Sequence, residues 1–280
     1  MMTTMDLRVI VLAAQRRGVI DPLATRFGVS HKCLAPLRGR PLIAHVMDTL
    51  AGCPGVGSIA VSVEAEAFEP VRGTLPATGT RIDLVPAADN IADSVIAAAS
   101  GHGGPLLITT ADNALLTRDS VQAMHAALRK HDAAIAMARR EAVLAAHPDG
   151  QRRFYRFRDG EFSNCNLYGI GNPLALHAAE IFRGGGQFAK KASRIVDAFG
   201  LANLILLRLR VLTLDGGLKR ISRRIGLGVV PVILPDGSQA IDVDNDRTYG
   251  VVDELLGGSA AQRGGEVAEH ELALAAGYRP

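Results

Sequence analysis

Short, uninterrupted apolar runs alternate along the chain with segments whose apolar residues recur every three or four positions. One run covers residues 7–13, LRVIVLA, and a later one covers residues 105–110, PLLITT. Runs this short, with no polar alternation, are typical of strands buried inside a parallel sheet. In residues 41–50 and 118–128 the apolar side chains share one face, as in amphipathic helices. The alternation therefore predicts an α/β fold in which helices cover both faces of a mostly parallel sheet.

The same pattern of apolar residues predicts the remaining strands and helices. Further strands are expected at 58–63, 81–85, 133–138 and 229–234, and a further helix at 92–100. Pro41 is expected in the first turn of its helix, and Thr117 is expected to cap the next one. Residues 152–157 and 161–170 read as two strands of a hairpin, because a turn-forming Asp-Gly pair lies between them. A last helix is expected to end at residue 256, with Asp246 as its N-cap.

The predicted domain organisation is simple. Residues 1–256 form one domain with a helical insertion around 187–225, and residues 257–280 form a linker and a C-terminal helix. The insertion combines an apolar stretch, 201–212, with a basic one, 218–224. It reads as buried core, as a lid, or as an element that contacts a membrane surface weakly. The apolar stretch is too short to span a bilayer, which needs about 20 residues.

Composition excludes several classes of protein. A net charge of +3, with 4% aromatic residues and no tryptophan, gives neither the basic surface nor the stacking residues of a nucleic-acid-binding protein. The three cysteines are odd in number and far apart, so neither a disulfide framework nor a cysteine metal site is expected. No signal peptide is recognisable at the N-terminus, and a cytoplasmic location is expected.

Charged residues gather in three places where predicted strands end. The first is the loop after residue 13, which carries Arg16, Arg17 and Lys32. The second is Asp112, and the third is the acidic segment 241–246, IDVDND. Ligands of open parallel sheets bind beyond the carboxyl ends of the strands. A basic loop beside separated carboxylates is what a nucleoside triphosphate with Mg²⁺ requires.

With these motifs in order, the chain resembles the nucleotidyltransferases of the molybdenum-cofactor and sugar-phosphate type. The resemblance covers about residues 7–256 and rests on three landmarks: Leu12-Ala13-Ala14 followed by Lys32 and Gly39-Arg40-Pro41-Leu42, then Asp112 after an apolar strand, then the motif IDVDND before a helix. It implies a Rossmann-like three-layer α/β/α (GT-A-like) domain with a mostly parallel central sheet. One departure stands out, because Gln15 occupies the place of the family's usual glycine.

The resemblance also implies roles for the opening loop. Lys32 would contact the triphosphate and stabilise charge on the α-phosphoryl group and pyrophosphate, and Arg16 and Arg17 would clamp the β- and γ-phosphates. An exposed lysine and a solvated basic turn are the alternatives. The residues expected to line the nucleotide here are Leu12, Ala13, Ala14, Gln15 and Gly18. Because glycine amides are scarce in this loop, arginine side chains are expected to take over part of the phosphate binding.

The acidic landmarks are the expected metal ligands. Asp112 and Asp244 would bind Mg²⁺, with Asp242 as a third ligand or a supporting group. In an extended Asp-Val-Asp segment both carboxylates point to the same side. An aspartate at a strand end also serves as a turn or cap residue, which is the alternative for Asp112.

Three further pairs have weaker assignments. Asp93 and Ser94 would touch the base or ribose, or else cap a helix. Asn164 and Asn166 would lie near the acceptor, or else satisfy backbone groups. Lys190 and Lys191 would neutralise an acceptor phosphate, or else lie on a solvated helix face.

The expected function is Mg²⁺-dependent transfer of a nucleoside monophosphate from a nucleoside triphosphate, with CTP slightly preferred, to a phosphorylated small molecule, releasing pyrophosphate. The acceptor class stays open among sugar, polyol, pterin and lipid-precursor phosphates, and the sequence does not indicate the oligomeric state. Two alternatives remain at this point. One is a GT-A-type glycosyltransferase that uses a nucleotide-sugar, and the other is a non-catalytic nucleotide-binding protein.

Overall fold

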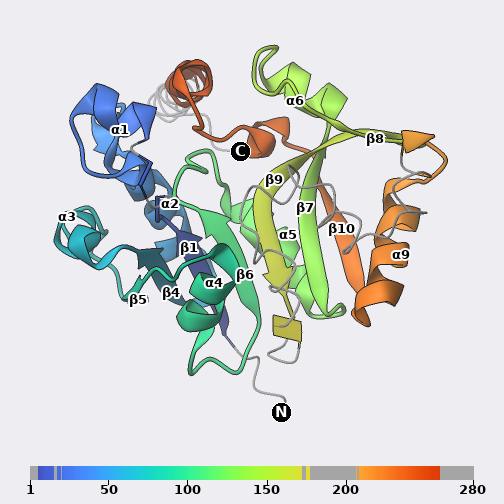
Figure 1. The fold of residues 1–280 in the computed structure, drawn as a ribbon, viewed down its shortest axis with the longest axis horizontal. Helices are drawn as coiled ribbons and strands as arrows, with labels where there is room; N and C mark the ends of the chain where they lie inside the picture. The colour runs from blue at the N-terminus through green and yellow to red at the C-terminus, as the bar shows by residue number, and fades with distance from the viewer. Residues whose placement is uncertain are drawn as a thin grey trace, which may run out of the picture.

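The computed structural model describes residues 6–15, 18–19, 21–171, 175–176, 206 and 208–258. Its centre is an eight-stranded sheet with the strand order β10-β7-β9-β6-β1-β4-β5, in which β8 pairs with β9 (Figure 1). The strands are β1 (Leu7–Leu12), β4 (Val56–Val63), β5 (Arg81–Pro86), β6 (Leu106–Thr110), β7 (Ala133–Arg139), β8 (Tyr155–Phe157), β9 (Gly160–Ile170) and β10 (Val229–Leu234). A separate two-stranded ribbon joins β2 (Pro36–Leu37) to β3 (Arg40–Pro41).

The sheet is mostly parallel, as the sequence predicted. β1 pairs in parallel with β4 and β6, β4 with β5, and β7 with β10. The long strand β9 is the exception, because it runs antiparallel between β6 and β7. The carboxyl ends of β1, β6 and β7 therefore lie at the same edge of the sheet, and β9 runs between β6 and β7 in the opposite direction.

Side chains that alternate along β1 explain the three layers. Val9 and Val11 belong to a core with the apolar faces of α2 (Leu42–Ala51) and α5 (Arg118–Leu128). Ile10 points the other way and packs with α4 (Ile91–Ala99). In Figure 1, α4 lies in front of the sheet and α5 behind it. Each fully buried aliphatic side chain contributes about 1.5–3 kcal/mol to stability, so the two cores hold the layers together.

Further elements complete the described chain. They are α1 (Pro22–Phe27), α3 (Phe68–Arg72), α6 (Arg140–Ala146), α9 (Leu214–Ile225), a helix at 246–258, and the 3₁₀ turns η1 (Lys32–Leu34), η2 (Ala65–Ala67) and η5 (Gly237–Ala240). Leu214 and Leu218 of α9 are buried in a third core with β7 and β10. This part of the expected insertion therefore packs on the sheet, while the domain boundaries themselves stay a prediction. Within the described part of the chain, none of the helices combines the length and apolar character needed to cross a membrane.

Three local predictions were wrong. Residues 152–154 form no strand, because β8 begins only at Tyr155. Pro41 is the N-cap of α2, and the helix itself begins at Leu42. Asp246 does not cap the last helix, since the Asn245 side chain accepts the hydrogen bonds from the N–H groups of Arg247 and Thr248. Asp246 pairs instead with Arg26, with an N–O distance of 2.7 Å.

Candidate active site

Three carboxylates meet at the edge of the sheet where β6 ends. Asp112 follows β6, and the Val243 N–H donates a hydrogen bond of 3.1 Å to the Asp112 carbonyl. This bond lays the segment 241–244 beside the strand end. Val243 points into the core, so Asp242 and Asp244 on either side of it point away from that core, and Asp242 stays half-buried while Asp244 is exposed. One oxygen from each of Asp112, Asp242 and Asp244 lies within 4.8 Å of the others.

The environment of the three carboxylates fits a divalent cation. Asp112 is buried, and its Oδ1 accepts no hydrogen bond from any residue that the structure describes. Burial, together with the charges of Asp112 and Asp244, raises the pKa of Asp242 to about 7. Like charges this close are costly unless a cation lies among them. Carboxylate oxygens are the ligands that Mg²⁺ and other hard cations prefer.

Lys32 contributes one positive charge to this cluster. It lies in η1, and its Nζ contacts Asp112 Oδ2 directly and lies 3.6 Å from Asp244 Oδ1. Burial alone would lower the pKa of Lys32, but the neighbouring Asp112 carboxylate raises it above its ordinary value. The ammonium group therefore stays charged at neutral pH. It can offset phosphate charge, and it is unsuited to act as a general base.

Side chains connect the described parts of the opening loop. The Gln15 N–H donates to Glu64 Oε1 at 2.8 Å, and Gln15 Nε2 donates to the Ser30 carbonyl at 2.8 Å. His31 Nε2 lies 3.3 Å from the other Glu64 oxygen. Gln15, at the family's glycine position, thus links the end of β1 to the segment just before Lys32. Glu64 follows β4 and was not predicted as a site residue, because no motif in the sequence marks it.

The other residues expected along the nucleotide loop lie as follows. Leu12 ends β1, Ala13 is buried and Ala14 is exposed. Gly18 has a φ of +70°, a conformation that suits glycine, with nothing near its missing Cβ. Arg16 and Arg17 lie outside the described residues, so their roles stay predictions.

Asp93 and Ser94 lie at the start of α4. The Asp93 N–H bonds to Asn90 Oδ1 at 3.0 Å, which makes Asn90 the N-cap. Ser94 Oγ accepts a hydrogen bond of 3.0 Å from the Ala88 N–H. Both residues therefore have structural contacts at the helix start, and a contact with base or ribose stays a prediction.

Asn166 reaches the carboxylate cluster from β9. Its Nδ2 donates to Asp242 Oδ2 at 2.7 Å, and its own N–H donates to Asn164 Oδ1 at 3.1 Å. Asn166 has a φ of +48°, which is uncommon for a residue other than glycine. Asn164 Nδ2 contacts the Tyr168 hydroxyl. The acceptor roles of both asparagines stay predictions, as do those of Lys190 and Lys191, which lie outside the described residues.

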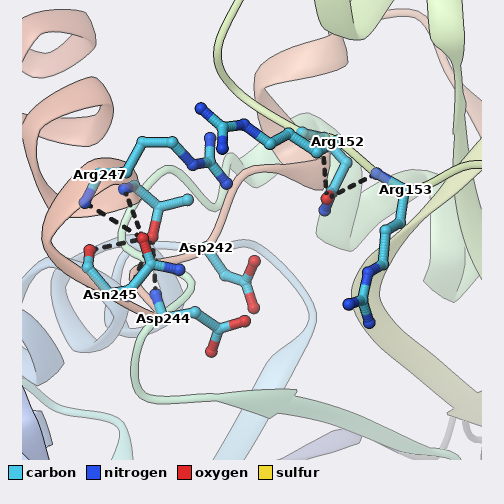
Figure 2. Close-up of a pocket in the computed structure, with 8 residues that line it drawn as sticks. Arg152, Arg153, Asp242, Asp244, Asn245 and Arg247 are labelled. Carbon is cyan, nitrogen blue, oxygen red and sulfur yellow. Dashed lines mark hydrogen bonds between the residues drawn. The ribbon is translucent and has the colours of Figure 1, made fainter.

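A cavity of about 540 Å³ opens beside Asp242 and Asp244 (Figure 2). Its other lining residues come from the turn after α6 and from the start of the last helix: Gln151, Arg152, Arg153, Asn245, Arg247 and Thr248. Arg152 and Arg153 were not predicted as site residues because residues 152–154 were assigned to a strand. The available signal was the pair Arg152-Arg153, which follows the turn-forming Asp149-Gly150 after one residue, Gln151.

The cysteines offer no nucleophile. Cys33, Cys53 and Cys165 are free and buried. Burial raises the pKa of the Cys33 and Cys165 thiols to about 12, so neither is a thiolate at neutral pH. The site instead combines carboxylates, a lysine and arginines. Such a set can hold phosphate groups and a metal ion by charge.

Comparisons with known proteins bear on the fold and the family of this chain. A solved hypothetical transferase from Thermus thermophilus is 25% identical, with a TM-score of 0.71 over 88% of this chain and 100% of that one. The 4-diphosphocytidyl-2C-methyl-D-erythritol synthase of Anaerococcus prevotii is 10% identical, with a TM-score of 0.59 over 91% of this chain and 99% of that one. A CMP:2-keto-3-deoxy-manno-octonic acid synthetase complexed with CTP is 12% identical, with a TM-score of 0.57 over 91% of this chain and 99% of that one.

The last two of these structures share the fold of this chain. The search among curated proteins finds no match. The family model described as the MobA-like NTP transferase domain matches residues 9–201 of the 280 in the chain, which is more than half of it. The chain therefore belongs to the MobA-like NTP transferase domain family, and it is a nucleotidyltransferase.

Proposed function

We propose that the protein transfers a nucleoside monophosphate from a nucleoside triphosphate to a phosphorylated small molecule, with Mg²⁺ as the metal and CTP as the preferred donor. The observation that carries the proposal is the cluster of Asp112, Asp242 and Asp244 with Lys32 among its oxygens. It lies at the carboxyl ends of parallel strands, where such folds bind their ligands. CTP is the first donor to test because CTP is bound in one structural neighbour and another is named as a diphosphocytidyl synthase.

The proposed reaction needs no nucleophilic residue in the protein. An oxygen of the acceptor phosphate forms a bond to the α-phosphorus, and the bond from the α-phosphorus to the bridging oxygen breaks. Pyrophosphate leaves with that electron pair. A phosphate acceptor is already an anion at neutral pH, so positioning and charge neutralisation supply the rate. This matches a site that has charged groups and buried, protonated cysteines.

Each residue then has a definite task. Asp112, Asp242 and Asp244 would hold the metal, and Asn166 orients Asp242 through its hydrogen bond. Mg²⁺ bound there would neutralise charge on the phosphate oxygens. Lys32 would turn from the carboxylates toward the triphosphate and stabilise the charge that develops on the leaving pyrophosphate.

The test is thermal unfolding with each of the four nucleoside triphosphates and with a nucleotide-sugar, each with and without Mg²⁺. The proteins are the wild type, Asp112→Asn, and Asp119→Asn as a matched exposed control. We expect one triphosphate to raise the melting temperature only with metal, in the wild type and the control but not in Asp112→Asn, because ligand binding stabilises the native state. Equal stabilisation of Asp112→Asn, or a response to the nucleotide-sugar alone, would contradict the proposal.

A further inference from the structure

The turn between α6 and β8, residues 147–154, packs directly against the acidic segment 241–246. Gly150 is buried, and a Cβ added to it would lie 2.4 Å from Ile241 Cδ1, so glycine is what allows this close approach. Ile241 immediately precedes Asp242. From the other side, Arg247 donates a hydrogen bond to the Asp149 carbonyl. The turn is thus fixed relative to the carboxylates by packing and by a charged hydrogen bond.

Gln151 fixes the direction in which the next two residues leave this turn. Its Oε1 accepts hydrogen bonds from the N–H groups of Arg152, at 2.9 Å, and Arg153, at 3.3 Å. Both arginine side chains line the cavity beside Asp242 and Asp244 (Figure 2). The Arg153 guanidinium makes no hydrogen bond or ion pair with any residue that the structure describes. The shortest ion pair of Arg152 is a 3.9 Å contact with the exposed Asp149.

Positively and negatively charged side chains line different parts of the cavity. Arg152, Arg153 and Arg247 line one part of it and Asp242 and Asp244 another, yet no ion pair joins the two sets among the described residues. Arginines with free donors bind carboxylates and phosphates in bidentate fashion. The described lining includes neither Lys32 nor the opening loop, which are assigned to the triphosphate. The volume suits a small phosphorylated molecule, since ligand pockets are about 300–1,000 Å³.

We propose that Arg152 and Arg153, supported by Gln151 and Arg247, bind the phosphate monoester of the acceptor. This assignment rests on the proposed function, and it adds the site of the second substrate. The bound phosphate lies between the arginines and the carboxylate cluster, facing the α-phosphorus of the donor. One of its oxygens forms the new bond to that phosphorus as pyrophosphate leaves, and the monoester dianion has no proton to lose on that oxygen.

The test uses the full chain saturated with Mg²⁺ and a non-hydrolysable analogue of the triphosphate that stabilises it. Inorganic phosphate and glycerol 3-phosphate are then titrated, with glycerol as the uncharged control, and binding is followed by calorimetry. The variants are Arg152→Gln/Arg153→Gln and the matched exposed pair Arg72→Gln/Arg129→Gln, which removes the same net charge elsewhere.

We expect the wild type and the control pair to bind both phosphates but not glycerol. Arg152→Gln/Arg153→Gln should bind them about tenfold more weakly or worse, since each lost charged hydrogen bond is costly. Its affinity for the triphosphate should stay within about twofold of the wild type, a difference too small to represent a lost hydrogen bond. Arg152→Lys/Arg153→Lys should restore only part of the phosphate affinity, because lysine keeps the charge and loses the bidentate geometry.

Other results would overturn the assignment. An equal loss of triphosphate affinity would place the arginines on the donor phosphates. Unchanged phosphate affinity in the double variant, or no phosphate binding by the wild type, would exclude them as an acceptor site. Triphosphate binding without phosphate binding overturns this assignment alone, whereas absence of any triphosphate binding overturns the proposed function as well.

Discussion

At the scale of single residues, Lys32 has two tasks, and the loss of each should be measurable separately in one variant. Its ammonium group neutralises Asp112 and Asp244 in the free protein, and it would serve the triphosphate during turnover. Lys32→Met should lower turnover strongly and should also destabilise the free protein by about 1–3 kcal/mol, less than for a fully buried pair. Mg²⁺ should restore more stability to Lys32→Met than it adds to the wild type, because metal and ammonium compete for the same oxygens.

Urea unfolding with and without Mg²⁺ measures both effects. Lys219→Met is a suitable control, since Lys219 makes an exposed ion pair with Asp215 on α9, far from the cluster in sequence. If Mg²⁺ stabilised Lys32→Met no more than the wild type, Lys32 would not occupy the metal position.

Glu64 is a second residue whose effect should be specific. Its carboxylate holds the Gln15 N–H and lies beside His31, next to Lys32. Glu64→Ala should weaken triphosphate binding and cost about 1–3 kcal/mol of stability, because a part-buried N–H loses its partner. Glu64→Gln keeps an acceptor oxygen and should recover most of the triphosphate affinity. Titration of the triphosphate measures this, and equal affinities for Glu64→Ala and the wild type would show that Glu64 does not position the loop.

Arg16 and Arg17 are predicted to bind phosphate in the opening loop, with their charge in place of glycine amides. Arg16→Ala/Arg17→Ala should raise the Michaelis constant for the triphosphate by about tenfold or more, as expected for lost charged contacts. Its unfolding free energy should stay near that of the wild type, since the sequence predicts that both arginines lie in a loop, where substitutions usually change stability little. Near-normal turnover in this double variant would refute the assignment.

At the scale of elements, the buried Arg8 connects β1 to β4, β5 and α4. It lies near the amino end of β1, whereas the candidate site lies at the carboxyl ends of the strands. The Arg8 guanidinium in β1 donates to the Ala98 carbonyl of α4 at 2.8 Å, to Ser58 of β4 at 3.0 Å, and to Asp83 of β5 at 2.9 Å. Burial would raise the pKa of Asp83, but hydrogen bonds from Arg81 and Arg8 lower it below the ordinary 3.8. The ionised carboxylate therefore stabilises the fold above pH 3.8, and this contribution is lost as the pH falls through the lowered value.

Asp83→Asn tests this contribution. At neutral pH the variant should be less stable than the wild type by about 1–3 kcal/mol, because Arg8 loses a charged partner. The difference should shrink as the pH falls below 3.8, where the wild-type carboxyl group also becomes protonated. Urea midpoints across the acid range measure it, with Asp215→Asn as the exposed control. A difference that stays constant with pH would mean that ionisation of Asp83 plays no part.

The elements also show what a sequence can predict. Strands and helices whose apolar residues repeat regularly were predicted within a few residues, as for β10 and for α5 with its Thr117 cap. The strand predicted from residue 152 begins later, because the Gln151 side chain accepts hydrogen bonds from the N–H groups of Arg152 and Arg153 in place of a strand partner. At the last helix, Asn245 and Asp246 are both good caps, and the ion pair of Asp246 with Arg26, far away in the sequence, is invisible to local reasoning.

At the scale of the whole molecule, the limits of prediction come from contacts between distant residues. The family landmarks placed Lys32, Asp112 and Asp244 in the right order, and the structure brings them together. The antiparallel insertion of β9 between β6 and β7 was not predictable, because a strand's own pattern does not specify its neighbours. That insertion brings Asn166 within hydrogen-bonding distance of Asp242.

The segment after β10 completes the domain, which leads to a prediction about its boundary. Val243, Val251 and Val252 are buried in the main core, and the Tyr249 hydroxyl donates to the Pro36 carbonyl at 2.6 Å. A chain ending at Ala240 loses these contacts and two of the three carboxylates. Each buried valine contributes about 1.5–3 kcal/mol, and total stabilities are about 5–15 kcal/mol, so this chain should not fold.

A chain ending at Gly258 retains every site residue named above, and its melting temperature should lie within about 2 °C of the full chain. It should also keep the triphosphate- and metal-dependent stabilisation, since residues 257–280 are predicted to be a linker and a C-terminal helix outside the domain. Circular dichroism melts of both shortened chains, with and without the triphosphate and Mg²⁺, measure these outcomes. A large loss of stability at Gly258 would show that the domain extends into the C-terminal residues, and the boundary at residue 256 would then be wrong.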